Sequence, residues 1–199
     1  MFKIGKRIIN KDSDPFIIAE VSGNHNGKID NVYKMIDLAS DNKIDAIKLQ
    51  TYTADTMTIN SSRPEFFIKD KRDLWKNNSL YDLYKKAYTP WSWHKKIFEY
   101  AKRRKIMCFS SPFDETAVDF LEDLNVPAYK IASFENTHLP LIKKVASTGK
   151  PMIISTGMAS IAELDETVQT IRDNGCKNFI LLKCTSTYPA TPVNIALLF

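Results

Sequence analysis

Apolar residues in this chain form two alternating patterns: short continuous runs, and longer stretches with apolar residues three or four positions apart. The second pattern is typical of amphipathic helices. The short runs are rich in Ile, Val and Phe and are apolar on both faces, as in parallel strands that helices cover. We therefore expect six strands, at residues 16–22, 45–51, 106–111, 127–133, 151–156 and 178–185.

Helices are expected after each of the first five strands. The clearest start is Ser160, where Glu163 completes a capping box, and Gly175 ends that helix. Pro90 is expected to break the helical stretch at residues 80–104, because proline lacks the amide that a helix interior needs. The remaining helices are predicted at residues 28–40, 114–124 and 139–149.

Repeated strand–helix units predict the α/β class, either as a (β/α)8 barrel or as an open doubly wound sheet. Neither GxGxxG nor GxxxxGK[ST] occurs, so both nucleotide-binding fingerprints are absent. In a barrel, alternate residues of each strand face inward, and the chemistry lies at the carboxyl ends of the strands. Applied to each predicted strand, this rule gives an inward set of Glu20, Lys48, Ser111, Lys130, Ser155 and Lys183.

This inward set predicts an anion site. Three lysines and one glutamate leave excess positive charge, which a bound anion would neutralise while serine hydroxyls donate to its oxygens. A phosphate and a carboxylate would both fit. The alternative is that the lysines extend to solvent or pair with Glu20 and Glu135.

Other candidates are weaker. Residues 24–27 (NHNG) are either a turn or a binding loop after the first strand. The long connection at residues 52–79 favours a lid or binding loop, in which a solvated charge run includes Arg63, Lys69, Lys71 and Arg72. Structural roles are expected for His94, His138, Trp91 and Trp93.

Composition narrows the function further. The 28 Lys+Arg and 23 Asp+Glu give a net charge of +5, scattered along the chain, which disfavours nucleic acid but allows an anionic substrate. No apolar run spans a membrane, and the polar N-terminus shows no secretory signal. Three cysteines without CxxC spacing indicate reduced thiols in a cytoplasmic protein, and three histidines without HExxH spacing offer no obvious metal site.

Six motifs together resemble the sialic acid synthase family, in order from Phe16 to Ala190. They are IIAEVSGNHNG, DAIKLQTYTADT, FSSPFDETAVDFL, VPAYKIASFE, KPMIISTGMAS and LLKCTSTYPA. The segment SLYDLYKKAYTPWSWH, the SSPFD form and Lys183, where relatives often have histidine, are most similar to the pseudaminic acid synthase branch. N-acetylneuraminate and legionaminate synthases are the near alternatives.

The resemblance implies condensation of phosphoenolpyruvate with an N-acetylated amino-sugar aldehyde. In the pseudaminate branch the sugar is 2,4-diacetamido-2,4,6-trideoxy-altrose, and the products are pseudaminic acid and phosphate. It also implies a (β/α)8 TIM barrel, an antifreeze-like domain, a homodimer and a divalent metal such as manganese. By matching motifs, the family's phosphoenolpyruvate positions are Lys48, Ser111, Lys130, Ser133, Ser155 and Ser186. Glu20 matches the acidic group near the reacting carbons, and the sugar region matches Asn24, Glu135 and Tyr188.

The chain also departs from the family pattern. It stops at Phe199, after about six βα units, so we expect residues 1–199 to be an incomplete N-terminal barrel domain. The metal's histidine ligands and the antifreeze-like domain are expected to be absent. We therefore expect little or no synthase activity from the chain alone. Phosphate release near that of a full-length relative, with manganese and both substrates, would contradict this expectation.

Two other hypotheses remain open. One is a lysine-dependent aldolase with Lys130 or Lys48 as the imine-forming group, which borohydride trapping with pyruvate would detect. The other is a non-catalytic fragment that binds a partner chain, for which the apolar tail IALLF makes association plausible.

Overall fold

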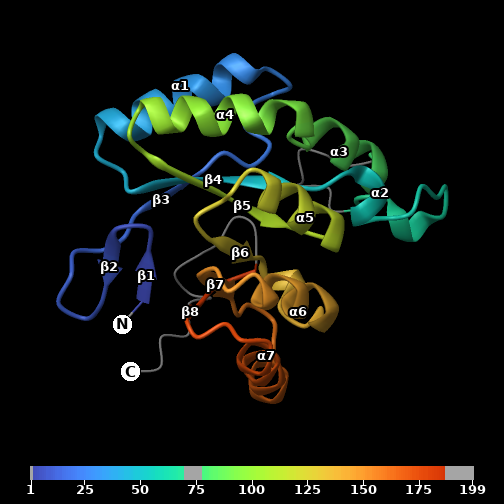
Figure 1. The fold of residues 1–199 in the computed structure, drawn as a ribbon. Coiled ribbons are helices and arrows are strands. Elements are labelled where there is room, and N and C mark those ends of the chain that lie inside the picture. Colours follow the sequence, from blue (N-terminus) through green and yellow to red (C-terminus); the bar gives the residue numbers. More distant parts are fainter. Residues whose placement is uncertain (1, 70–77, 187–199) are drawn as a thin grey trace. The chain divides into compact units, whose positions relative to one another are not determined.

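The computed structural model of the protein describes residues 2–69 and 78–186 (Figure 1). The chain divides into two compact units, Phe16–Leu124 and a second formed by Met1–Pro15 with Asn125–Phe199. Both units contain parallel strands that helices follow along the chain, which confirms the predicted α/β class.

The Phe16–Leu124 unit has three parallel strands paired in chain order. They are β3 (Ile18–Glu20), β4 (Ala46–Thr51) and β5 (Met107–Pro112). The helical elements of this unit are α1 (Ile29–Asp41), α2 (Ala54–Met57), η1 (Pro64–Phe66), α3 (Leu80–Ala87), α4 (Trp91–Arg103) and α5 (Glu115–Asp123).

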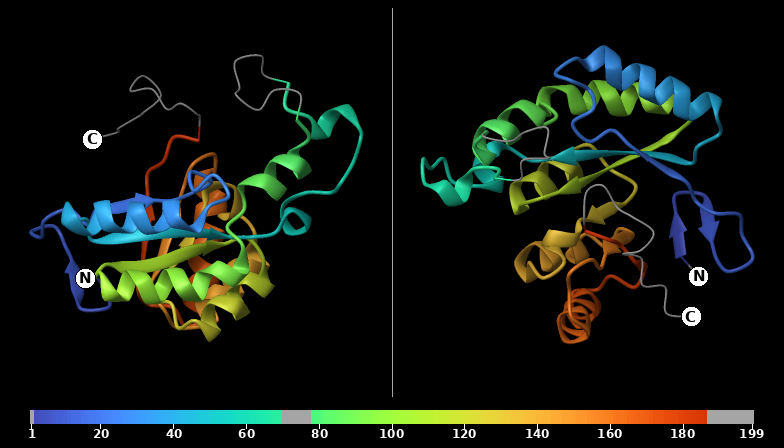
Figure 2. Two further views of the ribbon diagram at one scale, coloured as in Figure 1. Left: turned by 90° about the horizontal axis from the view of Figure 1, so that it is seen from above. Right: turned by 180° about the vertical axis from the view of Figure 1, so that it is seen from behind.

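Helices α1 and α4 lie side by side in Figures 1 and 2, with α1 packed on β4 and α4 packed on β5. The core between them is formed by Val32 and Ile36 from α1, Ile97 from α4, and Ile47 and Leu49 from β4, all of which are buried. Ile47 and Leu49 point to this core, so Lys48 points to the opposite face of the strand. Local sequence alternation therefore sets which face carries the charged group.

The second unit also has three parallel strands in chain order. They are β6 (Tyr129–Ile131), β7 (Met152–Ser155) and β8 (Phe179–Leu182). Its helical elements are η2 (Ser133–Glu135), α6 (Leu139–Ser147) and α7 (Ile161–Asp173), and α6 packs against α7.

An antiparallel hairpin, β1 (Phe2–Ile4) and β2 (Arg7–Ile9), belongs to this second unit and was not predicted from the sequence. Its strands are only three residues long, which is too short for a clear alternation signal. Gly5 supplies the positive φ that its tight turn needs. The Asn178 side chain fastens the hairpin to the start of β8, by accepting from Lys3 N at 3.1 Å and donating to Lys3 O at 2.6 Å.

The helix boundaries confirm the sequence signals. The Ser160 hydroxyl accepts from the Glu163 amide, and the Glu163 carboxylate accepts from the Ser160 amide. The Glu163 carboxylate accepts from both the amide and the hydroxyl of Ser160, and these bonds to its charged form lower its pKa. Pro90 separates α3 from α4, and Asp114 caps α5.

Candidate functional site

The first candidate cluster consists of Lys48, Glu20 and Ser111, which lie on β4, β3 and β5 toward the carboxyl ends of these strands. Lys48 is 5% exposed, and its Nζ lies 3.4 Å from the Glu20 carboxylate and donates to Ser111 Oγ at 3.4 Å. Strand register brings the first pair together, because Glu20 lies opposite Lys48 in the parallel ladder. Burial lowers the pKa of the Lys48 ammonium, and the negative charge of Glu20 opposes that shift.

Ser110, the neighbour of Ser111, belongs to a separate polar group on the other face of β5. Its hydroxyl lies 2.6 Å from Thr51 Oγ1, which in turn lies 2.9 Å from His94 Nε2. Burial lowers the pKa of His94 to about 4, so this imidazole is neutral at pH 7. His94 therefore joins α4 to the sheet, in agreement with the structural role expected for it.

The loop after β3 is a structured turn around His25. His25 is fully buried; its Nδ1 accepts from Gly27 N at 3.1 Å, and its ring meets Trp93 edge-on. Asn26 and Gly27 both have positive φ, which asparagine and glycine tolerate. Asn24, the residue assigned to the sugar region by resemblance, is exposed in this loop. The turn interpretation of NHNG thus holds for its backbone, while Asn24 remains accessible.

A second lysine cluster lies at the ends of β6 and β7, within the other unit. Lys130 is 7% exposed, and its Nζ donates to Ser155 Oγ at 2.6 Å and to Ile131 O at 2.8 Å. Cys184 Sγ lies 3.1 Å from the same Ser155 hydroxyl. The ammonium is thus held in place by short bonds, with a serine hydroxyl beside it. Both features suit an oxyanion ligand.

Two further serines, found only through the family resemblance, converge beside this cluster. Ser133 Oγ and Ser186 Oγ both lie close to the backbone of Gly157, where an added Cβ would be 2.9 Å from the first and 2.1 Å from the second. Ser186 Oγ is buried and has no hydrogen-bond partner in the structure. A buried hydroxyl without a partner is costly, so a ligand oxygen here would satisfy it.

Glu135 adds a carboxyl group to the same unit. Burial raises its pKa, and the nearby charge of Lys130 partly opposes the shift. Its Oε2 is buried without a hydrogen-bond partner. The first cluster likewise places a carboxylate, that of Glu20, beside its lysine, Lys48.

The predicted inward set is thus divided. Glu20, Lys48 and Ser111 meet in one unit, and Lys130 and Ser155 meet in the other. Lys183 follows the end of β8 and is exposed, so it does not join Lys130. Its prediction as an inward residue was wrong, because the strand register pairs Leu182 with Ser155, and Cys184 also reaches Ser155, so the intervening Lys183 points to the other face. Tyr188 lies outside the described residues.

The long connection after β4 is partly structured. Helix α2 packs against α3, and the Tyr81 hydroxyl donates to Asp55 Oδ1 at 2.9 Å. Trp91 packs on Phe120 and donates to Tyr52 O, in agreement with its expected packing role. Arg63 and Lys69 are exposed, and residues 70–77, which include Lys71 and Arg72, lie outside the described part.

Sequence reasoning missed Asn136, Thr167 and Gly157. Asn136 is 2% exposed and donates to Ser155 O at 3.1 Å and, more weakly, to Gly157 O at 3.5 Å. The buried Thr167 hydroxyl donates to Asn136 O at 2.6 Å. No spacing rule signals such bonds, because they join positions 19 to 31 residues apart.

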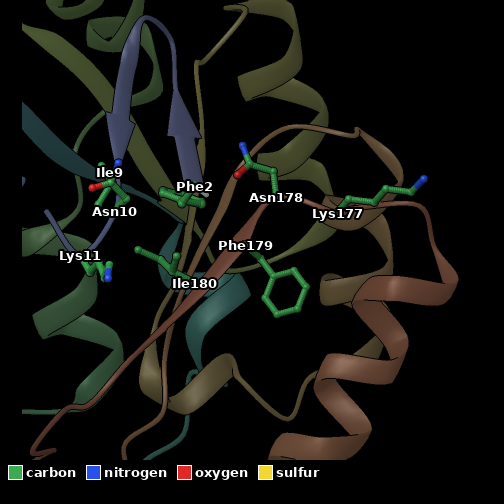
Figure 3. A pocket seen from close by; sticks show the side chains of 8 residues that line it. All are labelled: Phe2, Ile9, Asn10, Lys11, Lys177, Asn178, Phe179 and Ile180. Atoms are coloured by element: carbon green, nitrogen blue, oxygen red, sulfur yellow. The ribbon is translucent and has the colours of Figure 1, made fainter. Parts of the chain in front are cut away.

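A hollow of about 420 Å³ lies at the opposite, amino end of β8 (Figure 3). Phe2, Ile9 and Ile180 line it, together with Asn178 and Lys177. In a barrel-type fold this end of the strands serves stability rather than chemistry. The hollow also adjoins the Asn178–Lys3 bonds that hold the hairpin, so we assign it a structural role.

Within residues 2–69 and 78–186, no group of three or more His, Cys, Asp or Glu could hold a metal ion. The same residues contain no helix with the length and apolar character needed to cross a bilayer. Cys108, Cys176 and Cys184 are free thiols.

These observations define an α/β protein of the (β/α)8 barrel type, with buried lysines and serine hydroxyls toward the carboxyl ends of its strands. The sequence matches the NeuB family over residues 35–199, and the chain belongs to this family. The resemblance to sialic acid synthases is therefore confirmed.

Named relatives narrow the comparison. The chain is 44% identical to pseudaminic acid synthase of Campylobacter jejuni, over 90% of this chain and 52% of that protein. It is 43% identical to pseudaminic acid synthase of Helicobacter pylori, over 88% of this chain and 51% of that protein. Identity to N,N'-diacetyllegionaminic acid synthase of Campylobacter jejuni is 35%, over 87% and 52%. The chain spans about half the length of the curated relatives it matches.

Solved structures agree with the fold class. Spore coat polysaccharide biosynthesis protein SpsE of Bacillus subtilis matches with a TM-score of 0.76 and 34% identity, over 96% of this chain and 49% of that chain. N-acetylneuraminic acid synthetase of Leptospira borgpetersenii matches with a TM-score of 0.76 and 29% identity, over 96% and 63%. The barrel-type prediction is thus confirmed.

Proposed function

We propose that this chain binds phosphoenolpyruvate for its condensation with 2,4-diacetamido-2,4,6-trideoxy-altrose, which gives pseudaminic acid and phosphate. The observation that carries the proposal is the buried Lys130–Ser155 pair, which lies in the same unit as the Ser133 and Ser186 hydroxyls. Identity of 44% to a pseudaminic acid synthase supports this choice of reaction.

The chemistry asks for a site that holds a phosphate ester and a carboxylate while a C–C bond forms. Carbon 3 of phosphoenolpyruvate attacks the aldehyde carbon, water adds at carbon 2, and phosphate leaves with its bridging oxygen. We assign anion binding to Lys48, Ser111, Lys130, Ser133, Ser155 and Ser186. Their ammonium and hydroxyl groups can donate hydrogen bonds to the oxygens of a phosphate or a carboxylate.

Glu20 is proposed as the acidic group near the reacting carbons. Its side chain is 54% exposed, so a substrate can reach it, and its contact with Lys48 orients the carboxylate. A carboxylate in this position stabilises positive charge that develops at carbon 2, or moves a proton from the attacking water. Asn24, Glu135 and Tyr188 are proposed for the sugar.

The family's divalent metal would activate the sugar aldehyde as a Lewis acid. The described residues do not offer the ligand set for it, because no cluster of three His, Cys, Asp or Glu side chains lies within them. We therefore assign no step of this chain's chemistry to a metal. Association of the chain as a homodimer is likewise a proposal, and sedimentation velocity of the purified chain tests it.

The alternative substrates are the precursors of legionaminic and N-acetylneuraminic acid. Identity falls from 44% to 35% between the pseudaminic and legionaminic acid synthases of Campylobacter jejuni, which favours the first. Competition between the three amino sugars for the phosphoenolpyruvate-loaded chain would rank them. N-acetylmannosamine is the precursor in the N-acetylneuraminic acid alternative. A preference for it would overturn the proposed sugar but leave the proposed binding of phosphoenolpyruvate in place.

Calorimetric titration of the 199-residue chain with phosphoenolpyruvate tests the proposal. We expect Lys130→Gln to weaken binding by at least about tenfold, because a charge-assisted bond to an oxyanion is lost. Lys143→Gln is the matched control, since Lys143 is an exposed lysine of the same unit. Wild-type affinity in Lys130→Gln, or no binding by the wild-type chain, would contradict the proposal.

A lysine-dependent aldolase is the second candidate, because burial lowers the pKa of Lys48 and a neutral amine is needed to form an imine. Treatment with pyruvate and borohydride, followed by mass spectrometry, decides between the two. The synthase proposal predicts no covalent adduct on Lys48 or Lys130. An adduct on either lysine would contradict the synthase proposal and favour the aldolase.

A further inference from the structure

Gly157 marks a point beside the Lys130 cluster where a side chain has no room. A Cβ at this position would lie 2.1 Å from Ser186 Oγ and 2.9 Å from Ser133 Oγ. The φ of Gly157 is outside the positive range that favours glycine. The backbone conformation therefore does not require glycine here. Glycine is required because a side chain would collide with the two serine hydroxyls.

Asn136 holds this backbone in place. Its amide nitrogen donates to Ser155 O at 3.1 Å and lies 3.5 Å from Gly157 O, so one side chain spans the end of β7. Asn136 directly follows η2, the element that carries Ser133. The amide thus ties the segment of one serine to the segments of Ser155 and Gly157.

Thr167 of α7 supports Asn136 from the other side. Its hydroxyl donates to Asn136 O at 2.6 Å, and both residues are buried, with Asn136 at 2% exposed. Buried polar side chains of this kind persist where their bonds are satisfied. The chain of bonds therefore runs from α7 through Asn136 to two backbone carbonyls, that of Ser155 at the end of β7 and that of Gly157 just after it.

We propose that Asn136 is a positioning residue of the anion site, which holds Gly157 where the hydroxyls of Ser133 and Ser186 converge over its bare backbone. That the ligand is phosphoenolpyruvate rests on the proposed function, whereas the positioning of Gly157 by Asn136 does not. Asn136 acts through the serines, and its amide is suited to the task because it donates to carbonyl oxygens. An aspartate of the same size would instead present acceptors to those oxygens.

Asn136→Asp is the central variant, because it keeps the volume and reverses the hydrogen bonding. We expect its dissociation constant for phosphoenolpyruvate to rise by at least about tenfold, and that of Thr167→Val by about threefold. Thr170→Val makes the same change at another threonine of α7 and should leave affinity within about twofold. Folding of each variant is checked by circular dichroism and thermal unfolding.

Amide hydrogen exchange supplies a readout that does not depend on the ligand. In Asn136→Asp, exchange at Gly157 and Met158 should be at least about tenfold faster than in the wild type, because the local tether is lost. If the wild-type chain binds neither phosphoenolpyruvate nor inorganic phosphate, the proposed function fails, and exchange alone decides the positioning. Unchanged exchange in a folded Asn136→Asp variant would overturn the inference.

A double-mutant cycle tests the convergence at Gly157. Gly157→Ala should weaken phosphoenolpyruvate binding by at least about tenfold, because its methyl group displaces Ser186 and Ser133. In a Ser186→Ala background the same change should cost less, since the nearer clash is gone. Additive effects, or wild-type affinity in a folded Gly157→Ala variant, would contradict the proposed arrangement.

Discussion

The Lys130 ammonium donates to Ser155 Oγ across 2.6 Å, and both side chains are buried at neighbouring strand ends of one unit. Such a charge is costly to bury, and its bonds to Ser155 and Ile131 O offset part of that cost. These bonds fix the position of the ammonium group, as the proposed anion site requires. This relationship links the stability of the fold to its proposed function.

Lys130→Met should separate these two properties. We expect the variant to lose phosphoenolpyruvate binding while its free energy of unfolding stays equal or rises by about 1 kcal/mol, because an apolar side chain avoids the cost of burying a charge. Urea unfolding and calorimetric titration measure the two effects. Lys143→Met, at an exposed position, is the control. A strongly destabilised Lys130→Met would show that the lysine is structural.

Glu20→Gln should destabilise the other unit, because it leaves Lys48 buried beside a neutral partner. The expected loss in free energy of unfolding is about 1 kcal/mol, reduced from that of a fully buried pair because the Glu20 side chain is 54% exposed. Urea denaturation at low salt measures it. The control is Glu99→Gln, an exposed glutamate on α4. Equal losses in both variants would mean that the Glu20–Lys48 contact adds nothing.

His94 should make stability depend on pH. Its pKa is about 4 in the folded chain and about 6.5 when unfolded, so the unfolded chain binds more protons between these values. The stabilisation is therefore complete above pH 6.5 and falls as pH is lowered toward 4, by about 3 kcal/mol in total.

His94→Gln tests this pH dependence, because glutamine does not titrate. The difference in free energy of unfolding between pH 7.5 and pH 4.5 should be smaller in the variant than in the wild type. His25, whose pKa burial also lowers, is present in both proteins and cancels in the comparison. Identical pH profiles would show that His94 does not titrate as argued.

Asn178→Ala should loosen the hairpin without affecting the anion site. The variant loses two hydrogen bonds to Lys3, so we expect the free energy of unfolding to fall by about 1–2 kcal/mol. Phosphoenolpyruvate affinity should be unchanged, because Asn178 precedes the amino end of β8. Lys177→Ala, next to it and exposed, is the control for stability. A loss of affinity in Asn178→Ala would contradict the structural role.

The element order was accessible from sequence because its signals are local. Ser160 and Glu163 form a capping box through bonds three residues apart, and Pro90 ends a helical stretch by its own covalent geometry. Strand alternation likewise placed Lys48 and Lys130 on the face opposite their apolar neighbours. For Lys183 the rule was applied one residue out of register, because Leu182 and not Leu181 lies beside Ser155 in the sheet.

By itself, then, the sequence determined the repeated βα order, the faces of the strands and the residues that resemble a synthase site. Only the tertiary structure decided which groups meet: Lys48 with Glu20, Lys130 with Ser155, and Asn136 with the carbonyl of Ser155. The physical reason is that periodicity and capping act over a few residues. Register and packing, by contrast, bring together positions 19 to 28 apart in these pairs, and no local pattern records that closeness.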